Sequence, residues 1–360
     1  MLAAVARAGY TTPTPIQAQV IGPILDGRDV IGCAQTGTGK TAAFAIPAIE
    51  RLAATGSLPT SGNAGPRALV LAPTRELALQ IAETFDMLGP ALKTVVLIGG
   101  ESMGPQIQAL NKRPDIIVAT PGRLFDHLER RTANLGTVRI VVLDEADRML
   151  DMGFAPQVER ILRVVPLDRQ TLCFSATMPK EVEALVRHHL VRPVRVDAGA
   201  IARPVAKVTQ VLYRAQINDK TPLLLKLLGQ QRGQTLVFTR TKHRADRVAR
   251  AVQAAGHRVT RLHADRSMVQ RREALDGFRD GKYRVLVATD IAARGIDVPD
   301  IAHVVNFDLP HTAEDYIHRI GRTARAEAGG TASSFAAPEE RDQLRQIERH
   351  LGHPVPQLQA

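Results

Sequence analysis

Short runs of β-branched and other apolar residues recur through the first half of the chain. Each run is followed by Gly, Thr or Pro and then by a segment with helical spacing. The runs lie at residues 30–31, 69–71, 95–98, 116–118, 140–143 and 172–174. Strands that alternate with helices need crossover connections, which produce a parallel sheet covered by helices on both faces. The pattern therefore predicts an α/β domain.

The same alternation restarts after residue 207, with apolar runs at residues 208–213, 236–238, 285–288 and 304–305. Residues 197–206 are small, include Pro204 and show neither strand nor helix periodicity, which is typical of a linker. A chain of 360 residues exceeds the usual size of a single core, and its 44% apolar content is enough to fill two. We expect two α/β domains, at residues 1–202 and 203–360.

The composition indicates what kind of partner the chain binds and in which compartment it works. The formal net charge of +11 favours a polyanionic partner, although a basic chain can also serve solubility. The cysteines Cys33 and Cys173 form no CxxC pair, so neither a disulfide framework nor a structural zinc is indicated, and a reduced cytoplasmic setting fits. No run of 18 apolar residues occurs, so we expect no membrane segment.

The segment AQTGTGKT at residues 34–41 follows an apolar run and precedes a helical pattern. Small residues let backbone N–H groups surround phosphates at a helix N-terminus, while Lys40 can neutralise phosphate oxygens and the Thr41 hydroxyl can bind Mg²⁺. Ala34 stands where the general pattern has its first Gly, and a glycine-rich turn without a ligand is the alternative. The predicted nucleotide contacts here are Gln35, Thr36, Gly37, Thr38, Gly39, Lys40 and Thr41.

Two adjacent carboxylates, Asp144 and Glu145, come directly after the apolar run at residues 140–143. Open α/β sheets bind ligands at the carboxyl ends of their strands. Asp144 is suited to hold Mg²⁺, and Glu145 to orient and deprotonate an attacking water, as phosphoryl transfer requires. An acidic tetrapeptide by itself is more often a solvated turn, but together with the phosphate loop it indicates nucleotide hydrolysis.

The DEAD tetrapeptide at residues 144–147 and its neighbours resemble, in order and over nearly the whole chain, the motif series of DEAD-box helicases of superfamily two. The segments at residues 237–243 and 287–297 are similar to those of the bacterial RhlE-like subgroup. The resemblance implies two tandem RecA-like domains with ATP and Mg²⁺ between them. It also implies RNA-stimulated ATP hydrolysis that clamps single-stranded RNA and locally unwinds short duplexes or remodels RNA–protein complexes.

The resemblance also assigns roles to single residues. Tyr10 and Gln17 lie in segments similar to the Q motif and would bind adenine, and Arg322 and Arg325 of HRIGRTAR would be arginine fingers for the γ-phosphate. Guanidinium groups suit the charge that develops on a transferred phosphoryl group. The further nucleotide contacts implied are Gly295 and Asp297. The residues implied to couple ATP to strand opening are Asp147, Ser175, Thr177 and His318.

The expected RNA contacts combine hydroxyl groups, exposed glycine backbone and arginines, which suit sugar and phosphate rather than bases. Binding should therefore depend little on sequence and strongly on salt. Aromatic residues make up only 4% of the chain and Trp is absent, so stacking on bases should contribute little. The residues implied by the resemblance are Pro73, Thr74, Arg75, Gly99, Gly100, Thr120, Gly122, Arg123, Thr241, Arg271, Thr289 and Arg294.

The chain departs from the family pattern at a few positions. It starts after the point where an upstream aromatic residue usually stacks on adenine, so either the natural N-terminus is longer or ATP affinity is reduced. Met268 replaces a common Gln. Ala264 and Ala324 stand where Gly is usual, and a positive φ at either would cost about 1 kcal/mol.

Two alternative functions remain open from the sequence: a DNA-stimulated helicase with the same core, and an ATP-gated RNA clamp that unwinds little. The presence of Lys40, Glu145, Arg322 and Arg325 favours turnover. We expect a core that is monomeric and makes no membrane contact. Nothing in the chain names a specific protein partner.

Overall fold

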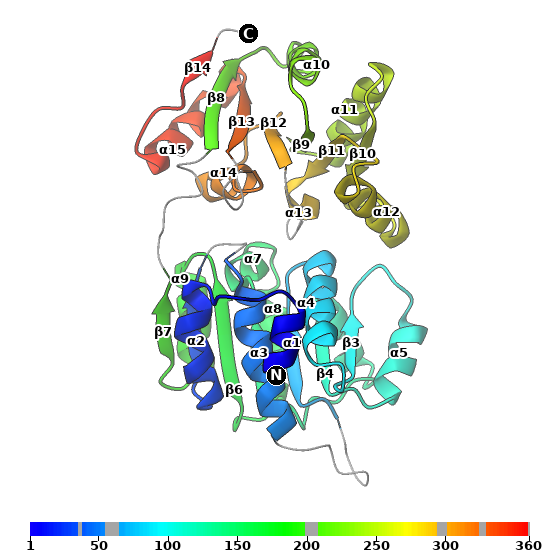
Figure 1. Cartoon of the computed structure of the whole chain (residues 1–360), viewed down its shortest axis with the longest axis vertical. Coiled ribbons are helices and arrows are strands. Elements are labelled where there is room, and N and C mark those ends of the chain that lie inside the picture. Colours follow the sequence, from blue (N-terminus) through cyan, green and yellow to red (C-terminus); the bar gives the residue numbers. More distant parts are fainter. Residues whose placement is uncertain (35–37, 55–64, 199–207, 294–300, 324–328, 359–360) are drawn as a thin grey trace. The chain divides into compact units, whose positions relative to one another are not determined.

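The computed structural model of the chain divides into two compact units, Met1–Ala200 and Ile201–Ala360. The sequence-based boundary lay near residue 202. Each unit contains one sheet and its own helices (Figure 1). The structure describes residues 1–34, 38–54, 65–198, 208–293, 301–323 and 329–358.

The sheet of the first unit has seven parallel strands in the order β3-β4-β2-β5-β6-β1-β7. The strands are β1 (Val30–Cys33), β2 (Ala68–Leu71), β3 (Thr94–Leu97), β4 (Ile116–Ala119), β5 (Ile140–Leu143), β6 (Gln170–Ser175) and β7 (Val194–Asp197). Every residue of β1, β2, β4, β5 and β6 is buried, and β2, β4 and β5 are uninterrupted apolar runs for this reason.

Helices cover both faces of this sheet. They are α1 (Leu2–Arg7), α2 (Pro15–Leu25), α3 (Lys40–Ala54), α4 (Arg75–Leu88), α5 (Met103–Asn111), α6 (Pro121–Glu129), α7 (Ala146–Asp151), α8 (Ala155–Val164) and α9 (Lys180–His189). On one face α2, α3 and α4 lie side by side (Figure 1), and Phe44 of α3 packs 5.4 Å from the ring of Phe174. On the other face Leu124 of α6 and Ile161 of α8 join the core.

The second unit repeats this architecture with strand order β10-β11-β9-β12-β13-β8-β14, again all parallel. Its strands are β8 (Val208–Arg214), β9 (Gln234–Thr239), β10 (Val259–Leu262), β11 (Val285–Thr289), β12 (Ile301–Asn306), β13 (Gly330–Ala336) and β14 (Gln357–Leu358). Its helices are α10 (Lys220–Gln230), α11 (Lys242–Ala254), α12 (Met268–Arg279), α13 (Asp290–Ala293), α14 (Ala313–Ile320), the 3₁₀ turn η2 (Pro338–Glu340) and α15 (Arg341–Leu351).

Alternate residues of β9 point to opposite faces of the second sheet. Val237 packs into the core under α10 and α11, whereas Leu236 and Phe238 pack into the core that α12 and α13 cover. The expected fold class, two RecA-like α/β domains with helices on both faces, is confirmed. Among the described residues, no helix combines the length and the apolar character that crossing a bilayer requires.

The apolar pattern missed four strands. Three of them, β7, β10 and β14, are edge strands with mostly half-buried or exposed residues. The fourth, β13, lies inside the sheet, but its sequence GTASSFA contains no apolar run. Its polar residues Ser333 and Ser334 can be buried because their hydroxyl groups form hydrogen bonds with the side chains of His303 and Asn306. The predicted linker was also wrong at its first residue, since Asp197 ends β7.

Candidate functional site

The phosphate-binding loop predicted at residues 34–41 joins the end of β1 to the start of α3. Ala34 is held by a hydrogen bond from its N–H to the carbonyl of Ser175 (3.0 Å). Lys40 is the first residue of α3, is buried, and donates from Nζ to the carbonyl oxygen of Ala34 (2.8 Å). Thr41 follows in the first turn of α3, where the partial positive charge of the helix end favours anions. Gln35, Thr36 and Gly37 lie outside the described residues.

Gln17 links the segment before α2 to this loop. Its side-chain amide donates to the carbonyl of Gly39 (3.1 Å) and its oxygen accepts from the N–H of Thr14 (2.9 Å), which completes the capping box of α2. Gly39 has a φ of +85°, and a Cβ there would lie 2.6 Å from the Gln17 nitrogen. Only glycine fits this position without displacing Gln17. Tyr10 is half-buried in the turn after α1.

Asp144 and Glu145 lie at the carboxyl end of β5, as the sequence predicted. Asp144 is 2% exposed, and its Oδ1 accepts from the N–H of Glu145 (3.0 Å). Burial raises the pKa of Asp144 to about 7, against the opposing effect of the Lys40 ammonium group. A cation placed beside this carboxylate would stabilise its ionised form.

The backbone of Glu145 adopts the left-handed conformation, with φ 49° and ψ 53°. This conformation is unfavourable for a residue with a side chain and is typical of sites where geometry serves function. The carboxylate of Glu145 is buried, and its Oε2 lies 3.5 Å from Nε of Arg148. The strained residue is therefore the N-cap of α7, two residues after the end of β5, and its side chain lies inside the unit.

Asp147 joins the DEAD tetrapeptide to the SAT segment at residues 175–177. Its Oδ2 accepts from the N–H and the hydroxyl of Thr177 (both 2.8 Å) and from the N–H of Ala176 (3.2 Å), while its own N–H donates to Ser175 Oγ (3.2 Å). Burial acts to raise the pKa of Asp147, but the hydrogen bonds with Thr177 and Ser175, together with the Lys40 ammonium group, outweigh it and lower the pKa. Asp147, Ser175 and Thr177, predicted to act together, are thus in direct contact.

Four of the RNA residues predicted in the first unit, Arg75, Gly99, Gly100 and Arg123, meet at the loop after β3. A Cβ on Gly100 (φ +79°) would lie 2.1 Å from a guanidinium nitrogen of Arg75, so the Arg75 side chain lies against this loop, although Gly100 is exposed and Gly99 half-buried. Arg123 of α6 reaches the same loop and donates to the carbonyl of Glu101 (2.9 Å). The remaining predicted residues, Pro73, Thr74, Thr120 and Gly122, lie in the turn before α4 and at the start of α6.

Two of these hydroxyl-bearing residues also begin helices. Thr74 caps α4 by accepting from the N–H of Leu77 (3.2 Å), and Thr120 is the N-cap residue of α6. In the second unit Thr241 caps α11 in the same way, accepting from the N–H of Arg244 (3.2 Å). The side chains of Thr74 and Thr241 thus cap the helices that follow them, whereas Thr120 occupies the N-cap position without a side-chain cap hydrogen bond.

The other residues predicted in the second unit are described in part. Arg271 of α12 is buried and donates to the carbonyl of His263 (3.0 Å), and Thr289 ends β11. His318 lies in the last turn of α14, and Arg322 is buried just after it. Ala264 has no positive φ, so the penalty that a positive φ would bring does not arise there. Arg294, Gly295, Asp297, Ala324 and Arg325 lie outside the described residues.

Sequence reasoning gave no role to Arg319, whose buried guanidinium group makes several hydrogen bonds within the second unit. It is 2% exposed and donates from Nε and Nη2 to both carboxylate oxygens of Asp290 (2.5 and 2.7 Å). Its Nη1 donates to the carbonyl of Asp308 (2.6 Å). The signal was helical spacing: Tyr316, Arg319 and Ile320 lie on one buried face of α14.

The comparisons with known proteins agree across the chain. The family described as DEAD/DEAH box helicase matches residues 14–185, and the helicase conserved C-terminal domain matches residues 219–327. The DEAD-box ATP-dependent RNA helicase CshA of Bacillus subtilis (strain 168) is 45% identical over 97% of this chain and 70% of its own length. The ATP-dependent rRNA helicase RRP3 of Yarrowia lipolytica is 44% identical over 95% and 71%.

Solved structures of similar fold also cover nearly the whole chain. Dbp5 of S. cerevisiae bound to RNA and ADP BeF3 aligns with a TM-score of 0.86 and 31% identity, over 100% of this chain and 92% of that one. Mss116p, with its NTE and C-tail deleted, bound to ssRNA and AMP-PNP aligns with a TM-score of 0.89 and 28% identity, over 99% and 76%.

Proposed function

The chain belongs to the DEAD-box family of ATP-dependent RNA helicases, and from this premise we propose that one ATP with Mg²⁺ drives both units to clamp a single RNA strand. The observation that carries the proposal is the meeting of Lys40, Asp144, Glu145 and Asp147 at the carboxyl end of one parallel sheet, beside the loop that begins α3. This is where open α/β sheets bind ligands.

Lys40 is placed to hold the phosphates. Its ammonium group rests on the carbonyl of Ala34, at the start of the phosphate loop. On ATP binding we expect it to exchange this carbonyl for the more negative β and γ oxygens, which form stronger charge-assisted hydrogen bonds. Tyr10 and Gln17 would bind the adenine, and the contact between Gln17 and Gly39 would link base recognition to the phosphate loop.

Thr41 and Asp144 would hold Mg²⁺, and the residues fit that ion. Among the described residues there is no cluster of three or more His, Cys, Asp or Glu that could form a cage for a metal. Mg²⁺ is usually bound by one or two carboxylates together with substrate phosphates, and Asp144 is a buried carboxylate whose ionised form burial disfavours. When bound, the ion neutralises charge on the phosphate oxygens.

Glu145 would act as the general base. Its carboxylate is buried at the end of β5, next to Asp144, and its left-handed backbone fixes the direction of the side chain. From that position it would orient a water molecule toward the γ-phosphate and accept its proton. Arg322 and Arg325 would stabilise the charge that develops on the phosphoryl group, with Gly295 and Asp297 as further nucleotide contacts.

RNA binding would be coupled to this chemistry through the SAT segment. Asp147 holds Ser175 and Thr177 by hydrogen bonds, so a shift of α7 on nucleotide binding would move the segment after β6. His318 would take the corresponding place in the second unit. Arg75, Gly99, Gly100 and Arg123 would grip the RNA backbone, since guanidinium groups and exposed glycine backbone suit phosphates.

The remaining RNA contacts proposed are Pro73, Thr74, Thr120, Gly122, Thr241, Arg271, Thr289 and Arg294. We also propose a cytoplasmic setting and a monomeric core. The proposal of a reducing compartment rests on the composition, since the chain has two cysteines, Cys33 and Cys173, and no CxxC pair.

The test is phosphate release by the full chain with ATP and Mg²⁺, measured without nucleic acid, with single-stranded RNA, and with DNA of matched sequence. We expect RNA to stimulate release and DNA to do so weakly, because only RNA carries 2′-hydroxyl groups. Equal rates with and without RNA would contradict the proposal, and equal stimulation by DNA would favour a DNA-stimulated enzyme.

Two variants separate the steps of the same assay. Glu145→Gln should still bind ATP but lose hydrolysis, since an amide cannot accept the proton of water, whereas Lys40→Ala should weaken ATP binding itself. Glu83→Gln, an exposed change on α4, is the control and should leave both measurements unchanged. RNA clamping without turnover in the wild-type chain would identify the protein as an ATP-gated clamp.

A further inference from the structure

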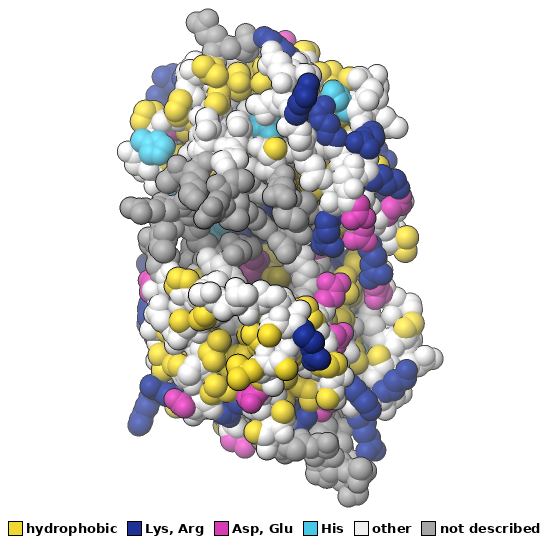
Figure 2. Space-filling view, viewed as in Figure 1, with side chains coloured by type: hydrophobic (Ala, Val, Ile, Leu, Met, Phe, Trp, Pro, Cys, Tyr) yellow, Lys and Arg dark blue, Asp and Glu magenta, His cyan; other side chains and the backbone are white. Residues whose placement is uncertain are grey.

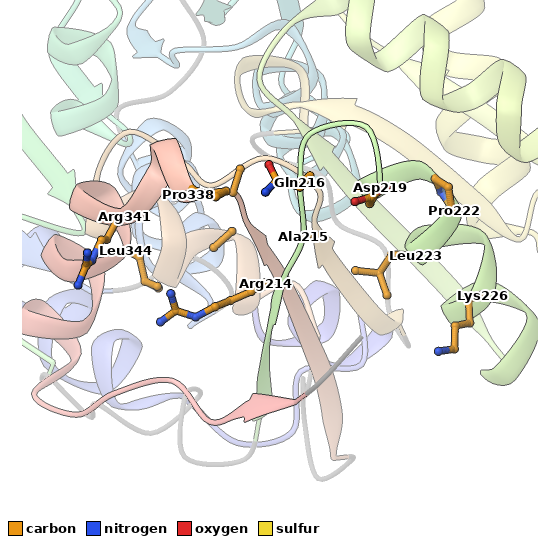
Figure 3. A pocket seen from close by; sticks show the side chains of 12 residues that line it. Arg214, Ala215, Gln216, Asp219, Pro222, Leu223, Lys226, Pro338, Arg341 and Leu344 are labelled. Carbon is orange, nitrogen blue, oxygen red and sulfur yellow. The ribbon is translucent and has the colours of Figure 1, made fainter.

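The second unit contains a pocket away from its described ATP and RNA residues. Its volume is about 660 Å³, within the range of about 300–1,000 Å³ that is usual for ligand sites. It opens between the loop after β8, the first turns of α10, and the segment from η2 to the start of α15 (Figure 3). Among the described residues of this unit, none proposed to bind RNA or ATP lines it.

The floor of the pocket is apolar. Leu223 of α10 and Leu344 of α15 are buried core residues whose side chains reach it, and Pro222 and Pro338 add exposed apolar surface. Next to the lining residue Gln216, Ile217 is 49% exposed. Exposed apolar surface beside a pocket is typical of a protein interaction site. No aromatic ring lines the pocket, so it offers no platform for stacking a base.

Charged residues at the edge of the pocket are mainly basic. Arg214, Lys226 and Arg341 are exposed lining residues, against a single carboxylate, Asp219. Within the part of the chain that the structure describes, no carboxylate forms a salt bridge with any of the three. In Figure 3 Arg214 and Arg341 lie on the side of Leu344, and Lys226 lies on the far side of Leu223. Cations spread in this way suit an extended acidic ligand better than one small anion.

The walls of the pocket are tied together beneath its surface. Glu340 lies between the lining residues Pro338 and Arg341 and accepts a hydrogen bond from the buried ammonium group of Lys220 (2.6 Å), which follows Asp219. The ion pair fixes the start of α10 against η2. A site that is already formed loses less freedom on binding, which favours affinity.

We propose that this pocket is a docking site for a short acidic segment of a partner protein, which inserts an aliphatic or aromatic side chain between Leu223 and Leu344. Carboxylates of the segment would lie against Arg214, Lys226 and Arg341. The partner would bind while RNA and ATP are bound.

The experiment selects binders from a display library of random 12-residue peptides on the immobilised full chain, in the presence of saturating single-stranded RNA. Enriched peptides should carry Asp or Glu around Leu, Ile or Phe. Labelled copies should bind in fluorescence anisotropy at least about tenfold more weakly to Arg214→Glu/Arg341→Glu, because both attractions become repulsions. Exchanging the apolar anchor for Ser should also abolish binding.

Arg349→Glu is the matched control, since it reverses an exposed charge on the same helix α15 outside the pocket, and it should keep wild-type affinity. Unchanged unfolding temperature and RNA-stimulated ATPase would show that the double variant is folded. Lys40→Ala should bind the peptides normally, so failure of the ATP proposal would not affect this result.

Several outcomes would overturn the docking proposal. Peptides that bind the double variant as tightly as the wild type would place the site elsewhere. Selection of basic peptides, or none, would contradict the charge argument. Displacement by RNA would make the pocket part of the RNA path, and self-association that the double variant abolishes would identify a second copy of this chain as the occupant.

Discussion

The backbone of Glu145, the residue proposed to act as the general base, is strained. It is one of only four non-glycine residues with positive φ among those that the structure describes, and the other three are arginines outside the site. The left-handed conformation costs an L-residue about 1–2 kcal/mol. Tertiary packing of β5, α7 and Arg148 must therefore hold Glu145 in place.

This strain predicts an unusual order of stabilities. Glu145→Gly should be more stable than Glu145→Ala by about 1 kcal/mol, because both lose the side chain but only glycine accepts the positive φ without penalty. Urea unfolding followed by circular dichroism measures the difference. At Glu83, an exposed interior position of α4, the order should reverse, with Ala about 1 kcal/mol more stable than Gly. The same order at both positions would refute the strain at Glu145.

Asp144 should make stability depend on pH. Burial raises its pKa from 3.8 to about 7, so the folded chain holds this proton more tightly than the unfolded chain. The resulting stabilisation is complete below pH 3.8 and is lost as the pH rises through about 7. The unfolding free energy of the wild type, relative to that of Asp144→Asn, should therefore decrease as the pH rises from about 4 to about 8.

At the upper end of this pH range, ATP with Mg²⁺ should raise the unfolding free energy of the wild type again, because ligands that bind only the folded state stabilise it. Adding a chelator of Mg²⁺ should remove this stabilisation. Thermal unfolding of both chains across the pH range measures the effect. Asp86→Asn, an exposed change on α4, should follow the wild type at every pH. A flat difference between wild type and Asp144→Asn would show that Asp144 is ionised throughout.

At the scale of elements, a buried arginine holds α14 to the sheet of the second unit. Arg319 pairs with Asp290 after β11 and reaches the carbonyl of Asp308 after β12, with its guanidinium carbon 5.0 Å from the ring centre of Phe238. The carboxylate of Asp308 in turn accepts from the N–H of Arg240 (2.9 Å), which lies at the end of β9. Arg319 and Asp308 thus join the carboxyl ends of β9, β11 and β12.

Removing one partner of this pair should be strongly destabilising. Arg319→Ala should lower the unfolding free energy of the second unit by about 3 kcal/mol or more, because it leaves the Asp290 carboxylate without its partner. Arg349→Ala, an exposed change on α15, should have little effect. Adding Asp290→Ala to Arg319→Ala should cost less than the sum of the two single changes, and strict additivity in this double-mutant cycle would show that the two residues do not interact.

At the scale of the whole molecule, the charge of +11 favours RNA through its phosphates. Basic side chains are spread over the visible surface together with acidic ones (Figure 2). Local geometry must therefore select which of them contact RNA. In the first unit the loop after β3, which Arg75 and Arg123 contact, combines guanidinium groups with the exposed backbone of Gly100.

RNA affinity should fall linearly with the logarithm of salt concentration and vary little among unrelated RNA sequences. Arg75→Ala should weaken binding and reduce the magnitude of the salt slope by about one, as expected for a lost phosphate contact. Arg163→Ala removes an exposed charge from α8 and should leave the slope unchanged. Fluorescence anisotropy with labelled RNA at several salt concentrations measures both variants. An unchanged slope for Arg75→Ala would exclude the phosphate contact.

Much of the fold and site could be predicted from the chain alone, because the signals are local. A buried parallel strand is a continuous apolar run, as in β5, and the cap of the helix that follows fixes where a side chain such as Thr74 stands. The phosphate loop and the DEAD tetrapeptide each occupy consecutive residues, so their chemistry could be inferred without a structure.

Only the tertiary structure decided the features that depend on contacts between distant residues. β13 is a central strand because His303 and Asn306 of its neighbour satisfy its buried serines, and no local pattern contains that pairing. The raised pKa of Asp144 requires the packing that buries it, and the left-handed backbone of Glu145 requires the elements around it. Local sequence set where the chemistry lies along the chain, whereas burial and long-range hydrogen bonds set the protonation, strain and connections of those residues.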